Sequence, residues 1–207
     1  MTRAEARETT FHAKPSYPAR MPRPNWFLAF PVAGAFVLEL PPLPPQFRRF
    51  HPEDVHLTLA FFGGCAEEHA LRALAVLDER LEQAPLSSIE VSLGEVVPMG
   101  GSRRSYTALS ALLERGRIET TAAIATLRDE LLEAATARRE QRPPKPHVSI
   151  ARPRGRATDA QREAALTWAA ELDLGQVSTR LDRIALYTWH EARHERLFRI
   201  VTERQLG

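Results

Sequence analysis

Seven short segments rich in β-branched and aromatic residues are interspersed with three amphipathic stretches, and this mixture is the strongest constraint on the fold. Such short segments predict β-strands. They cover 25–30, 54–62, 87–97, 104–112, 146–151, 178–189 and 196–201. Because strands and helices do not follow the regular order of parallel βαβ units, we expect an α+β fold in which helices cover antiparallel strands.

The three amphipathic stretches predict helices over 66–81, 118–135 and 158–172. In the first, one face carries four leucines: Leu71, Leu74, Leu77 and Leu81. The third opens with a capping box formed by Thr158 and Gln161, which is a typical helix start. We therefore expect three helices packed on the sheet.

Proline is concentrated near the N-terminus, where nine of the sixteen prolines fall between residues 15 and 45. This composition predicts a flexible, proline-containing arm over 1–24 and a single bilobal domain over 25–207. At 207 residues the chain is long enough to bury one hydrophobic core.

The cysteine content and the N-terminal sequence favour a cytoplasmic protein. Cys65 is the single cysteine, so the chain cannot form an internal disulfide, and the first 20 residues lack the apolar region of a signal peptide. The longest apolar run, 26–38, is too short to span a bilayer and is interrupted by Pro31 and Gly34. We expect no contact with membranes.

One short pattern occurs twice, in "HLTLAFFG" from His56 and in "HVSIARP" from His147. Each copy reads histidine, aliphatic, hydroxyl, aliphatic. Because side chains alternate along a strand, each histidine shares a face with the hydroxyl two residues later, Thr58 or Ser149. Strict alternation also predicts that the opposite face of the first copy packs on a core: Val55, Leu57, Leu59 and Phe61.

Two such strands facing each other suit acid–base chemistry on a phosphodiester. One histidine takes a proton from water while the other gives a proton to the departing oxygen, and the hydroxyls bind phosphoryl oxygens. Histidine serves both roles because its ordinary pKa, about 6.5, leaves both protonation states populated near neutrality. This chemistry needs no metal ion and no cofactor.

The two motifs, 91 residues apart, resemble the paired signatures of the two-histidine (2H) phosphoesterase superfamily. The likeness is greatest to the bacterial RNA 2',3'-cyclic phosphodiesterases, historically called 2'-5' RNA ligases, and it covers about 25–203. It implies a bilobal α+β fold in which two pseudo-symmetric antiparallel sheets, flanked by helices, form a central cleft. It also implies a hydrolase that opens a 2',3'-cyclic phosphate at an RNA or nucleotide end to a 2'-phosphomonoester. Some members also join RNA through a 2'-5' linkage.

The resemblance carries roles to individual residues. It implies that His56 donates a proton to the leaving oxygen and that His147 activates water, with Thr58 and Ser149 binding the phosphate. Arg152 matches an arginine that contacts phosphate or the RNA backbone. Simple alternation places Arg152 on the face opposite His147, so this role requires a bulge or a strand end before Pro153.

Aromatic residues near the motifs are candidates for stacking on a nucleobase: Phe61, Phe62 and Tyr187. Core packing is the alternative role for Phe61 and Phe62. One segment departs from the family pattern, because 33–50 is apolar and then proline-rich where relatives carry an amphipathic helix. The shape of the lobe around that segment therefore stays open.

The charge distribution suits a terminal phosphate better than a long duplex. A net charge of +2 is small for tight binding of long RNA. Between 138 and 156, however, seven basic residues face one acid, Glu140, which suits a phosphorylated ligand or marks a solvated loop. The basic residues are Arg138, Arg139, Arg142, Lys145, Arg152, Arg154 and Arg156.

Two alternative functions stay open at this point. The first is a module that binds nucleotides or RNA ends in the same cleft without turnover; in either case we expect a monomer. The second is a zinc hydrolase, since His190 and His194 spell H-E-x-x-H. The zinc motif requires a helix, whereas the preceding 180–189 is strand-like, and only thirteen residues follow His194 to supply a third ligand. The sequence does not name the physiological substrate.

Overall fold

The strands of this protein form one antiparallel sheet. The computed structural model describes residues 23–207, so all but the last two residues of the expected N-terminal arm lie outside the described residues. The nine strands are β1 (Asn25–Pro31), β2 (Phe47–Arg49), β3 (His56–Gly64), β4 (Ile89–Met99), β5 (Ala108–Arg115), β6 (His147–Pro153), β7 (Ser178–Leu181), β8 (Arg183–Trp189) and β9 (Phe198–Gln205). Every predicted strand segment contains a strand, and β2 is an addition that the sequence did not predict.

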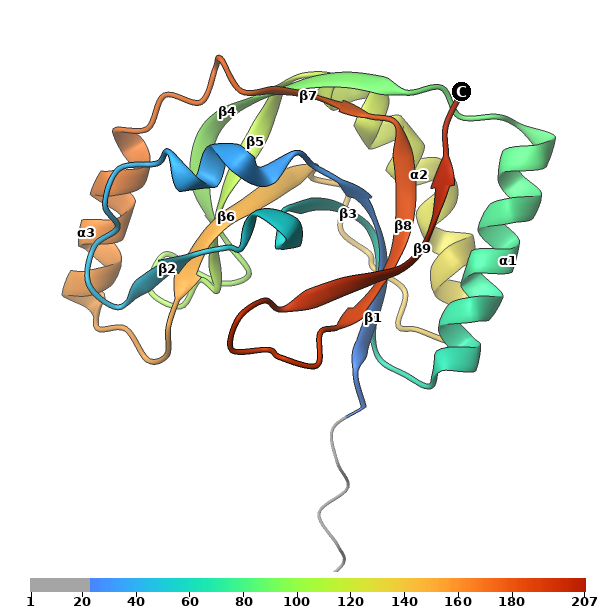
Figure 1. Ribbon diagram of the computed structural model, residues 1–207, viewed down its shortest axis with the longest axis horizontal. Coiled ribbons are helices and arrows are strands. Elements are labelled where there is room, and N and C mark those ends of the chain that lie inside the picture. Colours follow the sequence, from blue (N-terminus) through green and yellow to red (C-terminus); the bar gives the residue numbers. More distant parts are fainter. Residues whose placement is uncertain (1–22) are drawn as a thin grey trace, which may run out of the picture.

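The sheet has the order β7-β4-β5-β6-β3-β1-β8-β9, with β2 paired to β6. The expectation of two separate sheets is wrong, because β3 and β6 pair with each other where Leu57 meets Val148. The two halves, β3-β1-β8-β9 and β6-β5-β4-β7, are thereby joined through the two motif strands. Figure 1 shows that the joined sheet is strongly curled.

Three helices flank the sheet, as the periodicity predicts: α1 (Glu67–Gln83), α2 (Arg117–Ala134) and α3 (Asp159–Ala170). Helices α1 and α2 lie side by side at one end of the molecule, and α3 covers the other end (Figure 1). The capping box is present, since Thr158 and Gln161 exchange hydrogen bonds at the start of α3. Leu71 was expected on the buried face of α1 but is 43% exposed, and Ala70 and Ala73 pack there instead.

Two groups of buried residues lie on opposite faces of the sheet. The main core fills the space between the sheet and the helices and includes Leu57 and Val148. A smaller cluster on the other face, which we call the open face, is formed by Phe27, Ala29, Ala185 and Tyr187. In the part of the chain that the structure describes, no α-helix residue belongs to the cluster on the open face, and the side chains of the two motifs emerge there.

The atypical segment 33–50 forms no α-helix. It contains a 3-10 helix, η1 (Gly34–Leu38), and then the extended prolines that lead into β2. A second 3-10 helix, η2 (Pro52–Asp54), follows directly and packs against η1. The backbone of Pro52 approaches Gly34 so closely that a Cβ at position 34 would lie 2.1 Å from its carbonyl oxygen. This close contact packs η1 against η2, just before β3. None of the helices within 23–207 has the length and apolar character needed to cross a bilayer.

Candidate active site

The two motif histidines are held in the same way. His56 is the first residue of β3, and its Nδ1 lies 2.6 Å from the backbone carbonyl oxygen of Asp54. His147 is the first residue of β6, and its Nδ1 lies 2.7 Å from the carbonyl oxygen of Lys145. A carbonyl only accepts, so each Nδ1 carries a proton and each neutral ring keeps the lone pair of Nε2 available.

The four polar motif side chains emerge on one face of the sheet. Leu57 and Val148, which pair across β3 and β6, are fully buried in the main core. Their neighbours along each strand therefore point the other way, onto the open face. These neighbours are His56 and Thr58 on β3 and His147 and Ser149 on β6. The two imidazoles are close enough that His147 lowers the pKa of His56.

Each motif strand carries a one-residue bulge at the same place. Along β3, Thr58 pairs with Ala29 and Ala60 pairs with Leu28, which leaves Leu59 without a partner on β1. Along β6, Ser149 pairs with Ser110 and Ala151 pairs with Leu109, which leaves Ile150 unpaired. The extra residue is the third after the histidine in both strands. A bulge reverses the alternation of side chains that follows it.

The bulges decide where Phe61 and Arg152 point. Phe61 is 52% exposed on the open face, so the expectation that it packs on the core is wrong, whereas Phe62 is buried at 6% exposure. Arg152 lies opposite Arg48 in the β2–β6 pair, and the neighbouring Phe47 points into the main core. Arg152 therefore lies on the same face as His147, through the bulge that the sequence required for this placement.

Aromatic rings surround His56 on the open face. Its ring centroid lies 4.8 Å from that of Phe27, 5.4 Å from that of Tyr187 and 5.7 Å from that of Phe198, which meets it edge-on. Tyr187 is only 1% exposed and stacks on Phe27, so it has no free ring face for a nucleobase. The structure assigns Tyr187 to packing behind His56, which corrects the base-stacking expectation for this residue.

Burial tunes both histidines toward the neutral form. The pKa of His56 is lowered to about 4, and burial is the largest cause. The hydrogen bond to the Asp54 carbonyl opposes this lowering, and a charge on His147 contributes to it. Burial also lowers the pKa of His147, while the Lys145 carbonyl raises it and the Lys145 charge lowers it. Both rings are therefore mainly neutral at pH 7.

Ser110, which lies outside the repeated motif, contacts the hydroxyl of Ser149. The hydroxyl of Ser110 on β5 is fully buried and lies 3.0 Å from the hydroxyl of Ser149. This contact fixes the direction of the Ser149 hydroxyl beside His147. The sequence carried no local signal for this role, because Ser110 lies in an ordinary alternating strand 39 residues before Ser149.

Asp54 is a second residue that the sequence did not reveal. Its side chain is 1% exposed, and its two carboxylate oxygens accept from the backbone N–H groups of Leu197 (2.7 Å) and Phe198 (2.9 Å). Its own carbonyl holds His56. Asp54 thus fixes the imidazole and also anchors the start of β9, whose Phe198 packs against that imidazole. A charged residue two positions before the first motif histidine was the only available signal.

The H-E-x-x-H segment lies in the turn between β8 and β9, not on a helix. His190 Nδ1 accepts from the N–H of Ala192 at 3.0 Å, and His194 is exposed beside Glu195. Within 23–207, no three His, Cys, Asp or Glu side chains are arranged to hold a metal ion together. The geometry of the zinc-protease motif is therefore not formed here.

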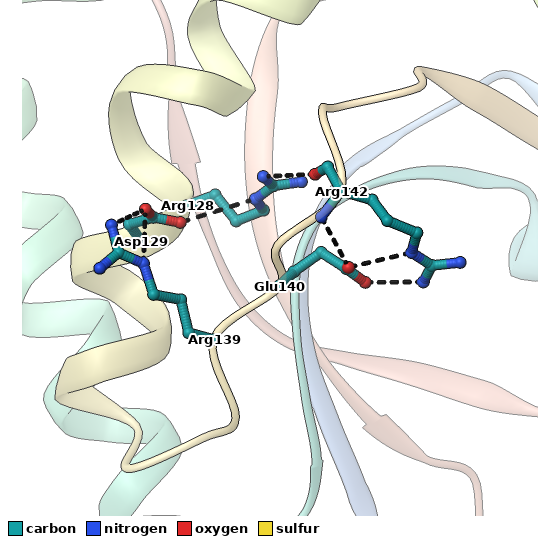
Figure 2. A network of polar contacts seen from close by, with 5 residues as sticks. All are labelled: Arg128, Asp129, Arg139, Glu140 and Arg142. Atoms are coloured by element: carbon teal, nitrogen blue, oxygen red, sulfur yellow. Dashed lines mark hydrogen bonds and ion pairs between the residues drawn. The ribbon is translucent and has the colours of Figure 1, made fainter.

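Part of the basic stretch 138–156 is neutralised locally. Figure 2 shows Arg139 bound to Asp129 and Arg142 bound to Glu140, with Arg128 donating to the Arg142 carbonyl. These pairs lie at the end of α2 and in the loop before β6. Arg139 and Arg142 therefore do not present free positive charge to a ligand, in contrast to Arg152.

Comparison with known proteins agrees with this geometry. Residues 42–193 match the family described as the 2'-5' RNA ligase superfamily. No match was found among curated proteins.

Several solved structures share the fold. A crystal structure described as a phosphoesterase has 16% identity and a TM-score of 0.63 over 89% of this chain and 99% of the other. Escherichia coli LigT in complex with 3'-AMP gives the same identity, coverage and TM-score. The Thermus thermophilus protein TT0787 has 20% identity and a TM-score of 0.63 over 88% of this chain and 97% of its own. At these identities the likeness shows a common α+β fold.

Proposed function

The chain belongs to the 2'-5' RNA ligase superfamily, and on that basis we propose that it hydrolyses 2',3'-cyclic phosphates at RNA or nucleotide ends. The product is a 2'-phosphomonoester. The reaction uses two histidines and no metal ion, and 2'-5' ligation would use the same site with an RNA 5'-hydroxyl in place of water as the group that attacks phosphorus.

One observation carries this proposal. His56 and His147 begin paired strands on one face of the sheet, and each donates its Nδ1 proton to the carbonyl two residues earlier. Each ring therefore offers Nε2 as its reactive atom. Two Nε2 atoms and the hydroxyls of Thr58 and Ser149 on the same face are the groups that in-line attack on a cyclic phosphodiester needs.

The proton transfers assign a role to each ring. His147 Nε2 takes a proton from water as the water oxygen bonds to phosphorus. The bond between phosphorus and O3' breaks, and the O3' oxygen takes a proton from His56 Nε2. Thr58 and Ser149 donate to the non-bridging oxygens, on which negative charge accumulates in the transition state. His147 ends protonated and His56 neutral, so one proton returns through solvent before the next turnover.

The negative charge of the substrate determines whether His56 is protonated when the reaction begins. Burial holds the pKa of His56 at about 4, so without a bound anion the proton donor is not charged at pH 7. A phosphodiester anion beside the ring favours the imidazolium and raises that pKa. Binding of the substrate thus supplies the charge that makes His56 an effective acid.

A binding module without turnover is the alternative. Escherichia coli LigT has been crystallised with 3'-AMP, with ATP and with phosphate, so a related cleft holds nucleotides and phosphate. The presence of both histidines, each with the same Nδ1 contact, favours the enzyme, because phosphate binding alone does not require two matched acid–base groups.

The test is turnover of a 2',3'-cyclic nucleotide and of a cyclic-phosphate-ended oligonucleotide, with and without EDTA. We expect 2'-phosphate products whose rate of formation does not change with EDTA. His56→Ala and His147→Ala should each lower kcat by roughly 100- to 10,000-fold with the fold intact, while His190→Ala has little effect. Near-normal activity in either motif variant would overturn the mechanism. Binding without turnover would support the alternative, and loss of activity with EDTA would support a metal enzyme.

A further inference from the structure

A small pocket with four arginines in its lining lies next to the candidate active site. It opens between β2, the end of β6 and the turn that joins β8 to β9. Asp54, whose carbonyl holds His56, lines this pocket, so the two sites meet. The lining residues are Arg48, Arg49, Phe50, His51, Asp54, Arg152, Arg193, Glu195 and Leu197.

None of the four arginines has an acidic partner within 4 Å among residues 23–207, and three of them make no hydrogen bond to backbone carbonyls either: Arg48, Arg152 and Arg193. Arg49 instead donates to the carbonyls of Leu40 and Pro41. The Nε of Arg152 is buried without a hydrogen-bond partner in the described part of the chain. Burial lowers the pKa of Arg152, and the nearby charges of Arg48 and Arg193 lower it further. Four arginines thus meet two carboxylates here, and Asp54 only partly offsets the effect of Arg48 and Arg193 on Arg152.

The two carboxylates of the pocket are engaged elsewhere. Asp54 uses both of its oxygens to accept from the backbone of Leu197 and Phe198. Glu195 lies against His194 on the exposed side of the turn. Neither carboxylate is paired with an arginine of the pocket, so a bound anion would be the counter-charge of all three guanidinium groups.

The pocket is fixed in place before any ligand arrives. The guanidinium of Arg193 lies 4.0 Å above the ring of Trp189, and that of Arg152 lies 6.0 Å from the ring of Phe50. The turn that carries Arg193 is closed by a hydrogen bond from His190 N to the Leu197 carbonyl, and Arg196 pairs with Glu53. Groups that are already ordered lose little conformational entropy when an anion binds.

We propose that Arg48, Arg152 and Arg193 bind the phosphodiester on the 5' side of the terminal ribose, so that the enzyme acts on RNA ends in preference to free cyclic mononucleotides. This rests on the proposed function and names its substrate class. Arg152 is the arginine of the second motif, whereas Arg48 and Arg193 come from β2 and from the H-E-x-x-H turn. Guanidinium groups suit this ligand because they bind phosphate through two parallel hydrogen bonds.

The spacing along the chain agrees with one nucleotide step. Asp54 and His56 are two residues apart, which is about 7 Å in extended backbone. The next phosphate upstream of a cyclic phosphate held at His56 would therefore reach the pocket without crossing the sheet. The net charge of +2 also favours recognition of a terminus over binding of a long RNA.

The experiment compares a 2',3'-cyclic mononucleotide with a dinucleotide that ends in the same cyclic nucleotide. We expect a higher kcat/KM for the dinucleotide, and the advantage should disappear when its internal linkage is a neutral methylphosphonate. Arg48→Gln and Arg193→Gln should each lower kcat/KM for the dinucleotide roughly tenfold and leave the mononucleotide unaffected. Thermal unfolding of each variant checks that the fold is kept.

Arg139→Gln is the matched control, because it removes the same charge from a residue that is already paired with Asp129. This variant should leave kcat/KM unchanged for both substrates. Equal losses on both substrates in the Arg48 and Arg193 variants would overturn the subsite, as would full activity on the methylphosphonate. If the wild type turned over neither substrate, the proposed function would have failed, and dinucleotide affinity in the same variants would still decide the subsite.

Discussion

Phe61 and Arg152 occupy equivalent positions, each five residues after its motif histidine and each returned to the open face by a one-residue bulge. The burial pattern of the first five residues is identical in β3 and β6. The two halves of the site are therefore matched in backbone but differ in chemistry, with an aromatic ring at one position and a guanidinium at the other. This difference predicts that Phe61 contacts the base and Arg152 contacts phosphate.

Phe61→Ala tests whether the ring of Phe61 stacks on the base of the substrate. Stacking of a base on an aromatic ring contributes about 1–3 kcal/mol, so KM for a cyclic nucleotide should rise roughly 10- to 100-fold with a smaller change in kcat. The free energy of unfolding should change little, because the ring is half exposed. Steady-state kinetics and urea unfolding measure the two effects.

Phe62→Ala is the matched control, since it removes the same ring from the adjacent, buried position. It should lower the free energy of unfolding by about 3–5 kcal/mol. An unchanged KM in Phe61→Ala, or a large loss of stability in that variant, would show that Phe61 serves packing instead.

The buried imidazole of His56 predicts how stability depends on pH. Its pKa is about 4 in the folded protein and about 6.5 in an unfolded chain. Between these values the unfolded state binds more protons, so the free energy of unfolding falls as pH falls from about 6.5 to about 4. The full loss from this residue is roughly 3 kcal/mol, and above pH 6.5 its contribution is constant.

Urea unfolding of the wild type and of His56→Gln between pH 4 and pH 7.5 measures this loss as a difference. The variant should lose less stability on acidification than the wild type does. His194→Gln, at an exposed position, should keep the wild-type dependence. Parallel curves for His56→Gln and the wild type would contradict the low pKa of His56.

The same pKa shifts predict a difference between two rate profiles. The pH dependence of kcat/KM reports the free enzyme, in which burial lowers the pKa of both histidines. The dependence of kcat reports the complex, in which the substrate anion raises them. Both profiles should be bell-shaped, with the optimum of kcat at higher pH. Their apparent pKa values belong to the coupled pair. A flat profile through neutrality would count against paired histidines as acid and base.

Local pattern was sufficient to predict most of the fold and to single out the two histidines of the candidate site. Period-3.6 and period-2 patterns found the helices and strands, and the repeated motif found His56 and His147. Strict alternation failed at Phe61, because a bulge is set by the pairing of β3 with β1, which one strand does not encode alone. The roles of Ser110 and Asp54 could not be predicted for the same reason, because they depend on partners far away in sequence. The single sheet likewise depends on the contact between Leu57 and Val148.

Asp54→Asn tests whether the residue that holds His56 also organises the surrounding site. The carboxylate accepts from two backbone N–H groups, whereas a carboxamide turns an NH2 donor toward one of them. Leaving that buried N–H unsatisfied should lower the free energy of unfolding by about 1–3 kcal/mol. It should also lower kcat, because the start of β9 loosens and Phe198 no longer holds the edge of the His56 ring.

Glu53→Gln is the neighbouring control for this prediction. Glu53 is largely exposed and pairs with Arg196, and removing an exposed ion pair should cost less than about 1 kcal/mol. Equal effects of the two substitutions on stability and kcat would show that Asp54 contributes only charge. A larger loss in Asp54→Asn, with the pH optimum of kcat displaced, would show that the Asp54 carboxylate positions His56 through the chain that surrounds it.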